Sequence, residues 1–529
     1  MQNSELETSL HLFQPPLYRS AKGNWFKNFH DAVLESDMYF TIDNAAILSI
    51  ISFGWASGDS TLFSEIKRRP WLSKIDENGD VILGAIPPHG RLYQTANQIA
   101  HRLLKLLQDE ALIACNNKKS IYILLSGGLD SRIIAGILAS LYYSGLLKTK
   151  PVALTWGISN SRDVYYARLV AQTIGIDWQY IPLYPELLLE NIVVTANKLA
   201  AIHSPELLHS MTQLKELPPD AIVFAASYGD SIGRAEFGGR HLLELDYLKP
   251  FNAFHLLREN IFQRAYLSVI NDFADLHKRS KNAPKYAHCE YEMQGFRMRS
   301  GLCHALTVIN NYCYIYQAFT HPNVYSYIWS IHPVCRNDDI YIALLNQLDC
   351  RLLAIPWART NKALKGGSVN VKKDLKRDYH EYTTWCATLL YDEIVKYIEP
   401  DWFHSTGIFD ANRIKQLNKE VRQSRYRVGR LTDIWLWLAA FRLFIDNYKK
   451  LGIKVEFDNR TTHNSFKAMI KHSNNTLRLK TLRLFLTKFS IINYFFRDMR
   501  TLIRKIRRCL IFKKALKIYP PISQNYHEQ

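Results

Sequence analysis

The fold is decided at residues 121–131, which read Ile-Tyr-Ile-Leu-Leu-Ser-Gly-Gly-Leu-Asp-Ser. The first five are apolar and rich in β-branched and aromatic side chains, which predicts a short buried strand. The Ala- and Leu-rich run over residues 133–146 is longer and predicts a helix. Glycines let the backbone approach an anion, and the first N–H groups of a helix are unpaired and carry the positive end of its dipole. The sequence therefore predicts a phosphate-binding turn between strand and helix.

The turn resembles the pyrophosphatase-type loop of enzymes that split ATP to AMP and pyrophosphate. The P-loop of kinases and GTPases requires Gly-x-x-x-x-Gly-Lys-Ser/Thr, and that pattern is absent from the chain. An ordinary glycine turn without chemical meaning is the alternative. The candidate nucleotide-binding residues of this turn are Leu125, Ser126, Gly127, Gly128, Leu129, Asp130 and Ser131.

Further apolar runs at residues 151–157, 178–183 and 221–225 predict strands that alternate with helices. This alternation predicts an α/β fold in which a parallel sheet is flanked by helices. Because crossover helices place the carboxyl ends of parallel strands at one edge, nucleotides bind there in open sheets. The run at 221–225 leads into a second acidic turn, Gly229-Asp230. Two carboxylates at this edge, Asp130 and Asp230, could share a magnesium ion on the phosphates; a plain polar turn is the alternative for the second.

The composition favours a large folded protein of the cytoplasm. Of the 529 residues, 47% are hydrophobic and 22% are charged, and by length alone we expect two to four domains. The eight cysteines are scattered without a Cys-x-x-Cys pair, which fits reduced thiols better than disulfides or a zinc site. The acidic, polar start shows no secretory signal. The longest clean apolar stretch, residues 45–55, is too short to span a bilayer.

The positive charge is concentrated near the C-terminus. Between Lys467 and Lys517 there are fifteen Lys or Arg and one acidic residue, so this tail supplies +14 of the net charge of +19. Apolar residues recur there at three- and four-residue steps, which predicts basic amphipathic helices. Such helices suit an anionic membrane surface or an acidic partner, and packing against the body is the alternative. No compact RNA-binding module is recognisable, which argues against nucleic acid as the partner.

Residues 45–365 resemble the synthetase half of asparagine synthetase and its relatives. An upstream stretch, Gly-Trp-Ala-Ser-Gly-Asp-Ser-Thr-Leu-Phe at 54–63, matches the segment that links the halves of those enzymes. Asp163 matches a family acid and is equally explained as a carboxylate favoured by a helix N-terminus. The other matching stretches are the loop at 126–131, Gly229-Asp230, residues 296–299, 318–322, 336–341 and 355–360.

The resemblance implies a sheet of the adenine-nucleotide alpha-hydrolase type, with ATP and Mg²⁺ as cofactors. Family members adenylate a carboxylate, release pyrophosphate, and form an amide when an amine attacks the acyl-adenylate. It further implies that Asp130 and Asp230 hold the metal and pyrophosphate, and that the strand end with Thr155 and Gly157 covers the adenine. A lysine next to the stretch at 355–360, Lys362 or Lys365, could neutralise the charge on the departing pyrophosphate; an ordinary solvated surface lysine is the alternative.

Three departures from the family concern the nitrogen donor and the acid substrate. Glutamine-using members carry a catalytic cysteine directly after the initiator Met, where this chain has Gln2, and too few residues precede Gly54 to form a glutaminase domain. The family's Ser-Gly-Glu-Gly is replaced by Ala-Ala-Ser-Tyr at 225–228, and the Asp of Pro-Phe-Leu-Asp falls at His321. We therefore expect ammonia from a separate subunit, or another amine, and a product other than free asparagine.

The first hypothesis is an ATP-dependent, AMP-forming amide ligase acting on a small molecule, a glycan uronic acid or a peptide carboxylate. A tRNA-modifying enzyme with the same loop and a non-catalytic membrane-associated scaffold are the alternatives. We expect a remnant linker region at residues 1–93, a ligase domain at 94–450 and a basic tail at 451–529. The tail would hold a cytoplasmic protein against the inner face of the membrane.

Overall fold

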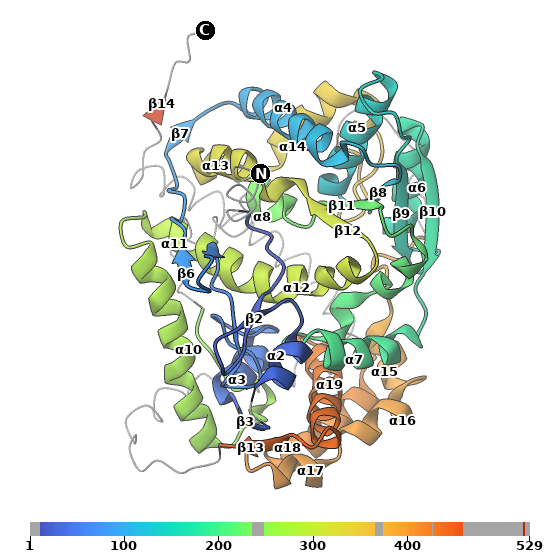
Figure 1. The fold of residues 1–529 in the computed structure, drawn as a ribbon. Coiled ribbons are helices and arrows are strands. Elements are labelled where there is room, and N and C mark those ends of the chain that lie inside the picture. The colour runs from blue at the N-terminus through green and yellow to red at the C-terminus, as the bar shows by residue number, and fades with distance from the viewer. Residues whose placement is uncertain are drawn as a thin grey trace.

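The computed structural model describes residues 11–36, 38–234, 248–364, 374–425, 427–458 and 522–523. Its centre is a five-stranded sheet with the order β10-β9-β8-β11-β12, in which all neighbouring strands are parallel. Figure 1 shows this sheet in the upper right of the molecule with helices around it. The α/β fold predicted from the sequence is therefore confirmed. The strands are β8 (Ile121–Leu124), β9 (Val152–Gly157), β10 (Asp177–Pro182), β11 (Ile222–Ala225) and β12 (Tyr314–Gln317).

Two helices beside the first strands of the sheet begin directly after residues whose side chains cap them. Thr95 caps α4 (Ala96–Cys115) with a reciprocal bond to Gln98, and the Ser161 hydroxyl caps α6 (Arg162–Ile174). The phosphate-loop strand is followed by α5 (Leu129–Tyr143), as predicted. A later helix, α14 (Asp338–Leu348), packs against both α4 and α5. Because α5 begins directly after the loop, α14 lies beside the loop as well.

The strand order creates a crevice beside β8. From β8 the chain proceeds outward to β9 and β10 on one side, whereas β11 and β12 lie on the other side. In open α/β sheets, ligands bind at the carboxyl ends of the strands where the order reverses in this way. The loop after β8 and the turn after β11 therefore meet at the position that this topology favours for a ligand.

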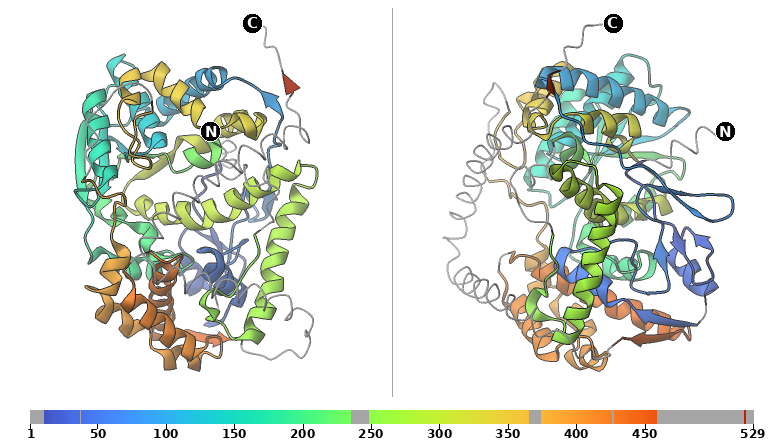
Figure 2. Two further views of the ribbon diagram at one scale, coloured as in Figure 1. Left: turned by 180° about the vertical axis from the view of Figure 1, so that it is seen from behind. Right: turned by 90° about the vertical axis from the view of Figure 1, so that its left-hand side faces the viewer.

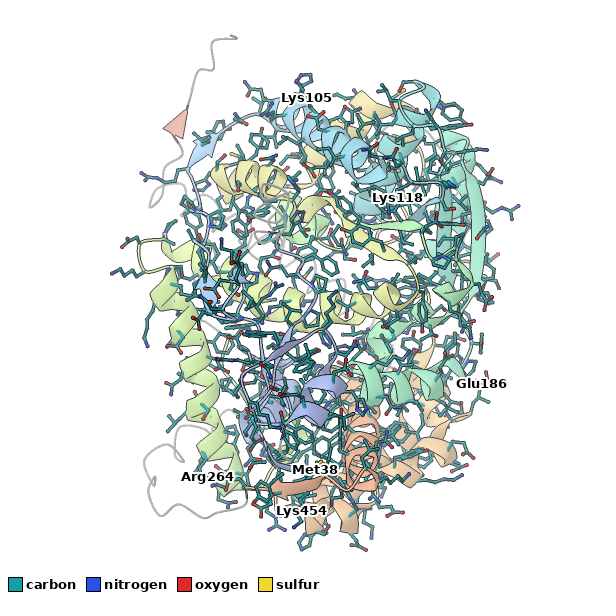
Figure 3. All side chains as sticks on the ribbon, viewed as in Figure 1. Met38, Lys105, Lys118, Glu186, Arg264 and Lys454 are labelled. Atoms are coloured by element: carbon teal, nitrogen blue, oxygen red, sulfur yellow. The ribbon has the colours of Figure 1, made fainter. Side chains whose placement is uncertain are left out.

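The N-terminal region forms small sheets whose partners lie far along the chain. β1 (Tyr18–Arg19) pairs with β2 (Trp25–Phe26) and with β4 (Lys67–Arg68). β3 (Tyr39–Ile42) pairs in parallel with β13 (Lys454–Phe457), and the Lys454 N–H donates to the Met38 carbonyl (2.9 Å). Figure 3 shows these two residues beside each other. β1 and β3 thus take strand partners from outside the first 40 residues, and a search for local periodicity does not detect such pairing.

A mostly helical part completes the molecule. Figure 2 shows that the helices between residues 400 and 450 lie at the end of the molecule opposite α4 and α5. The α-helices and strands not yet named, together with the π-helix η4, have the following bounds: α2 (Phe29–Glu35), α3 (Asn44–Phe53), α7 (Leu187–Lys198), α8 (Gly229–Gly233), α10 (Glu259–Arg279), α11 (Lys285–Glu292), η4 (Met293–Leu302), α12 (Cys303–Leu306), α13 (Pro322–Ser330), α15 (Tyr382–Ala387), α16 (Tyr391–Ile394), α17 (Pro400–Ser405), α18 (Ala411–Gln423), α19 (Leu431–Lys450), β5 (Ser73–Ile75), β6 (Val81–Leu83), β7 (Leu92–Tyr93) and β14 (Ile522–Ser523).

The larger of the two hydrophobic clusters among the described residues runs from Leu12 to Ile453, and Trp329, Trp435 and Trp437 are among its largest fully buried side chains. Residues on both sides of the predicted boundary at 93/94 belong to it, and the domain boundaries stay a prediction. The predicted amphipathic helices of the tail lie outside the described residues. In the part of the chain that is described, no helix combines the length and apolar character needed to cross a membrane.

Candidate nucleotide site

The turn after β8 is held by its own two serines. The Ser126 N–H donates to Ser131 Oγ (3.0 Å), the Gly128 N–H donates to Ser126 Oγ (3.1 Å), and the two hydroxyl oxygens lie 3.0 Å apart. Gly128 is the residue that precedes the first turn of α5, and among the described residues no side-chain hydrogen bond caps that helix start. The two serines thus fix the turn at a helix N-terminus, which is the local geometry that the sequence predicted for anion binding.

Gly127 is enclosed by two segments. Its N–H donates to Asp163 Oδ1 (3.2 Å) at the start of α6, and its carbonyl accepts from the Ala358 N–H (3.1 Å). A Cβ atom at this position would lie 2.7 Å from the Ala358 Cβ, so a glycine is required by the close approach. Burial raises the pKa of Asp163 to about 6, although the Gly127 N–H opposes that shift. Asp163 is therefore both a residue of the α6 start and a support of the loop.

Replacing Asp163 by Asn is expected to stabilise the protein at pH 8 and to change little at pH 4. The folded pKa of about 6 exceeds the ordinary value of 3.8, so the folded state binds more protons between these values. Stability then falls as pH rises through that window, by up to about 3 kcal/mol. Denaturant titrations at both pH values check this, with the exposed Asp220→Asn as the control. A difference between variant and wild type that is equal at both pH values would contradict it.

Arg132, in the second turn of α5, ties a distant segment to the loop. Its buried guanidinium donates to the carbonyls of Leu352 (2.9 Å), Ile355 (2.9 Å), Pro356 (3.0 Å) and Gly127 (3.4 Å). The sequence interpretation missed this residue, although an arginine inside an apolar helical run is itself a signal of a buried polar contact. Residues 352–356, which include the start of the family-like stretch at 355–360, are thereby fixed to the loop.

The second acidic turn lies directly against Asp130. A Cβ atom built on Gly229 would lie 2.5 Å from Asp130 Oδ1 and 2.6 Å from Asp130 Cβ. The Gly229 carbonyl accepts from the Tyr341 hydroxyl (2.9 Å) of α14. The structure thus brings together the two acids, Asp130 and Asp230, that the sequence placed at the ends of β8 and β11.

Replacing Gly229 by Ala is expected to reduce the rate of any ATP-dependent reaction at this site at least about tenfold. The new methyl group overlaps the Asp130 side chain, and such overpacking costs about 1–3 kcal/mol and displaces the overlapped group. Initial rates of the two proteins check this. Gly301→Ala is the matched control, because its methyl group would lie 3.8 Å from the nearest atom. Equal rates for Gly229→Ala and wild type would contradict the expectation.

Arg234 links the two acids and was missed by the sequence interpretation. Its Nη2 lies 3.4 Å from Asp130 Oδ2 and also contacts Asp230, and its Nη1 lies 2.7 Å from Asp338 Oδ1. Burial raises the pKa of Asp130, and the positive charge of Arg234 opposes that shift. The only sequence signal for Arg234 is its position four residues after Asp230.

Magnesium fits the donors at this site. Mg²⁺ usually takes one or two carboxylates from a protein and completes its octahedron with phosphate oxygens and water. Asp130 Oδ1 is buried and accepts no hydrogen bond from the described residues. Within the described ranges, no group of three or more His, Cys, Asp or Glu side chains could hold a metal. Asp130 and Asp230 would therefore hold Mg²⁺ only together with phosphate oxygens.

The residues predicted for the adenine lie at the end of β9. The Thr155 hydroxyl donates to the Leu125 carbonyl (2.8 Å) and accepts from Trp178 Nε1 (3.0 Å), so its side chain ties β9 to the loop strand. The Gly157 carbonyl accepts from the Tyr180 hydroxyl (2.7 Å). The same carbonyl also accepts from the Leu183 N–H (3.1 Å), so the Thr155 hydroxyl and the Gly157 carbonyl both have protein partners.

Lys362 is not brought to the acids. It is exposed, its carbonyl accepts from the Trp357 N–H (2.9 Å), and among the described residues no ion pair joins its ammonium to a carboxylate. Lys365 lies outside the described residues. The cation that the structure does place beside Asp130 is Arg234.

Two of the altered positions at the predicted acid-substrate end, Tyr228 and His321, are buried. Tyr228 is fully buried and directs its hydroxyl to the Leu12 carbonyl (3.4 Å). His321 caps α13 and its Nδ1 lies 2.8 Å from Glu110 Oε1. The family-like stretch upstream also has a partner: Arg299 of the π-helix η4 binds Asp59 (2.8 Å).

Comparison with known proteins agrees with the motif at the loop. Residues 102–200, which include the loop, Asp163 and β9, match the asparagine synthase family. A solved structure of NMN synthetase from Francisella tularensis matches 41% of this chain and 94% of its own chain, with 14% sequence identity and a TM-score of 0.21. No curated protein matches the chain. The family match supports an ATP-dependent ligase in general.

Proposed function

We propose that this chain, with its asparagine synthase match at residues 102–200, joins a carboxylate to an amine with cleavage of ATP to AMP and pyrophosphate. The observation that carries the proposal is the contact between the two acidic turns at the switch point of the sheet. Asp130 at the start of α5 packs against Gly229, and Asp230 follows directly. This arrangement supports ATP cleavage between the α- and β-phosphates, with pyrophosphate at the start of α5.

In the first half-reaction, a carboxylate oxygen of the substrate attacks the α-phosphorus. The bond from that phosphorus to the bridging oxygen of the β-phosphate breaks, and pyrophosphate leaves. Magnesium would be held by Asp130 and Asp230 with phosphate oxygens and would neutralise charge on the phosphates. The positive end of the α5 dipole would lie toward the same charge. The packing of residues 352–358 over the loop, secured by Arg132, helps to exclude water from the acyl-adenylate.

In the second half-reaction, an amine attacks the acyl carbon of the adenylate, loses a proton, and displaces AMP to leave an amide. We propose ammonia from a separate subunit, or an amine on a second substrate, as the nucleophile. The carboxylate would belong to a small molecule, a glycan uronic acid or a peptide. The replacement of the family's acidic residue by His321, which is paired with Glu110, supports a substrate other than free aspartate.

The test is the identity of the nucleotide product. The full-length protein is incubated with ATP, Mg²⁺, ammonium and panels of uronic acids or peptides, and the nucleotides are separated by chromatography. AMP and pyrophosphate in equal amounts, together with exchange of labelled pyrophosphate into ATP, support the proposal. Formation of ADP and phosphate, or no binding of ATP by calorimetry, would contradict it.

A further inference from the structure

The guanidinium of Arg234 contacts more carboxylates than its single positive charge can neutralise. Three carboxylates contact it, those of Asp130, Asp230 and Asp338, and their combined charge exceeds that of one arginine by two units when all are ionised. ATP brings several further negative charges to the start of α5. A resident cation at this position therefore lowers the repulsion that the nucleotide meets.

The two terminal nitrogens of Arg234 have different partners. Nη1 binds the Asp338 carboxylate at 2.7 Å, and that carboxylate is half exposed at the start of α14. Nη2 is shared between Asp130 (3.4 Å) and Asp230, the two predicted metal-holding acids. The Asp338 contact can therefore persist while Nη2 changes partner, because the two bonds lie on separate atoms.

Two aromatic rings fix the plane of the guanidinium. The Arg234 Cζ lies 5.4 Å from the ring centre of Tyr341 and 5.4 Å from that of Trp357. The side chain is largely buried, and its Nε atom has no hydrogen-bond partner among the described residues. A desolvated, stacked guanidinium with an unused donor is preorganised for phosphate, whose oxygens accept the paired N–H groups of arginine.

We propose that Arg234 is a phosphate-binding residue of the ATP site. It neutralises Asp130 and Asp230 before the nucleotide arrives, and it donates from Nη2 and Nε to the β- and γ-phosphates when ATP is bound. Asp338, Tyr341 and Trp357 hold the guanidinium in place during this exchange of partners. This inference rests on the proposed function, since it requires ATP to bind at the start of α5.

The test compares ligands that differ only in their phosphates. Calorimetry of the full-length protein with ATP, AMP and adenosine is carried out with Mg²⁺ and with EDTA, for wild type, Arg234→Gln and Arg234→Lys. Loss of one or two charge-assisted hydrogen bonds weakens ATP binding about 10- to 100-fold in Arg234→Gln. The affinities for AMP and adenosine are expected to stay within about twofold of wild type. The ATP affinity of Arg234→Lys is expected to lie between those of wild type and Arg234→Gln.

Arg359→Gln is the matched control. The Arg359 Cζ lies 5.6 Å from the same Trp357 ring, but its side chain is exposed, and its replacement should leave all three affinities unchanged. Equal loss of ATP, AMP and adenosine binding in both Arg234 variants, or unchanged ATP binding, would overturn the inference. A wild-type protein that binds no ATP would instead overturn the proposed function. If Arg234→Gln does not fold, as judged by its circular dichroism, Arg234→Lys takes its place. A loss of ATP affinity without a matching loss of AMP and adenosine affinity in that variant supports the inference.

Discussion

Replacing Asp130 by Asn is expected to lower pyrophosphate release from ATP by about 10²- to 10³-fold, the cost of removing one preorganised charge from a transition state. Asn keeps the shape of the side chain against Gly229, so the packing of the two acidic turns is retained. It removes the negative charge that faces Arg234 and that would hold the metal. Initial rates at saturating ATP, with thermal unfolding as the check on folding, measure the effect.

Asp339→Asn is the control for this prediction. Asp339 is an exposed carboxylate in the first turn of α14, next to Asp338. This variant tests whether the loss of any carboxylate near the site slows pyrophosphate release. Its rate of release should stay within about twofold of wild type, as expected for a surface substitution away from the reaction. A wild-type rate in Asp130→Asn would mean that ATP is cleaved without this carboxylate, and the proposed site would be wrong.

Replacing Arg132 by Met is expected to lower the free energy of unfolding by about 3–5 kcal/mol. The methionine fills much of the volume but leaves four buried carbonyls without their shared donor, and removing one partner of a buried charged network costs that much. For a chain of this length, the melting temperature should fall by roughly 3–5 °C. Pyrophosphate release should fall with it, because the segment over the loop loses its anchor.

Arg351→Met is the control for the Arg132 prediction. Arg351 pairs with Asp349 at 2.7 Å on the surface, and its side chain is largely exposed. Exposed pairs contribute only about 0.2–1 kcal/mol, so unfolding should change little. Similar melting temperatures for Arg132→Met and Arg351→Met would show that the four carbonyl contacts do not stabilise the fold.

The α/β part of the chain was predictable because its signals are local. The strands at 121–124, 152–157 and 222–225 are apolar runs, and α6 has its own start signal in Ser161. The meeting of Asp130 with Asp230 followed from one topological rule, that parallel strands end at a common edge. These predictions needed no knowledge of contacts between distant residues.

The rest of the site depends on contacts that the sequence does not display. Arg234 acquires its role because α14, more than a hundred residues later, brings Asp338 and Tyr341 to it. Lys362 looked suitable because it follows the family-like stretch, yet it is exposed, while Arg234 stacks on the nearby Trp357. A motif search finds residues at a fixed separation along the sequence. The contacts of Arg234 join residues that are near one another only in the folded chain.

The pairing of β3 with β13 has a consequence for how the protein is made. Roughly 410 residues separate the two strands, and a ribosome needs about 20–80 s to add that many. Throughout this interval β3 has an open edge, which is a template for pairing with another chain. Newly made protein is therefore exposed to aggregation at its N-terminal end until residues 454–457 emerge, and a chaperone that covers this edge during synthesis should raise the yield of folded protein.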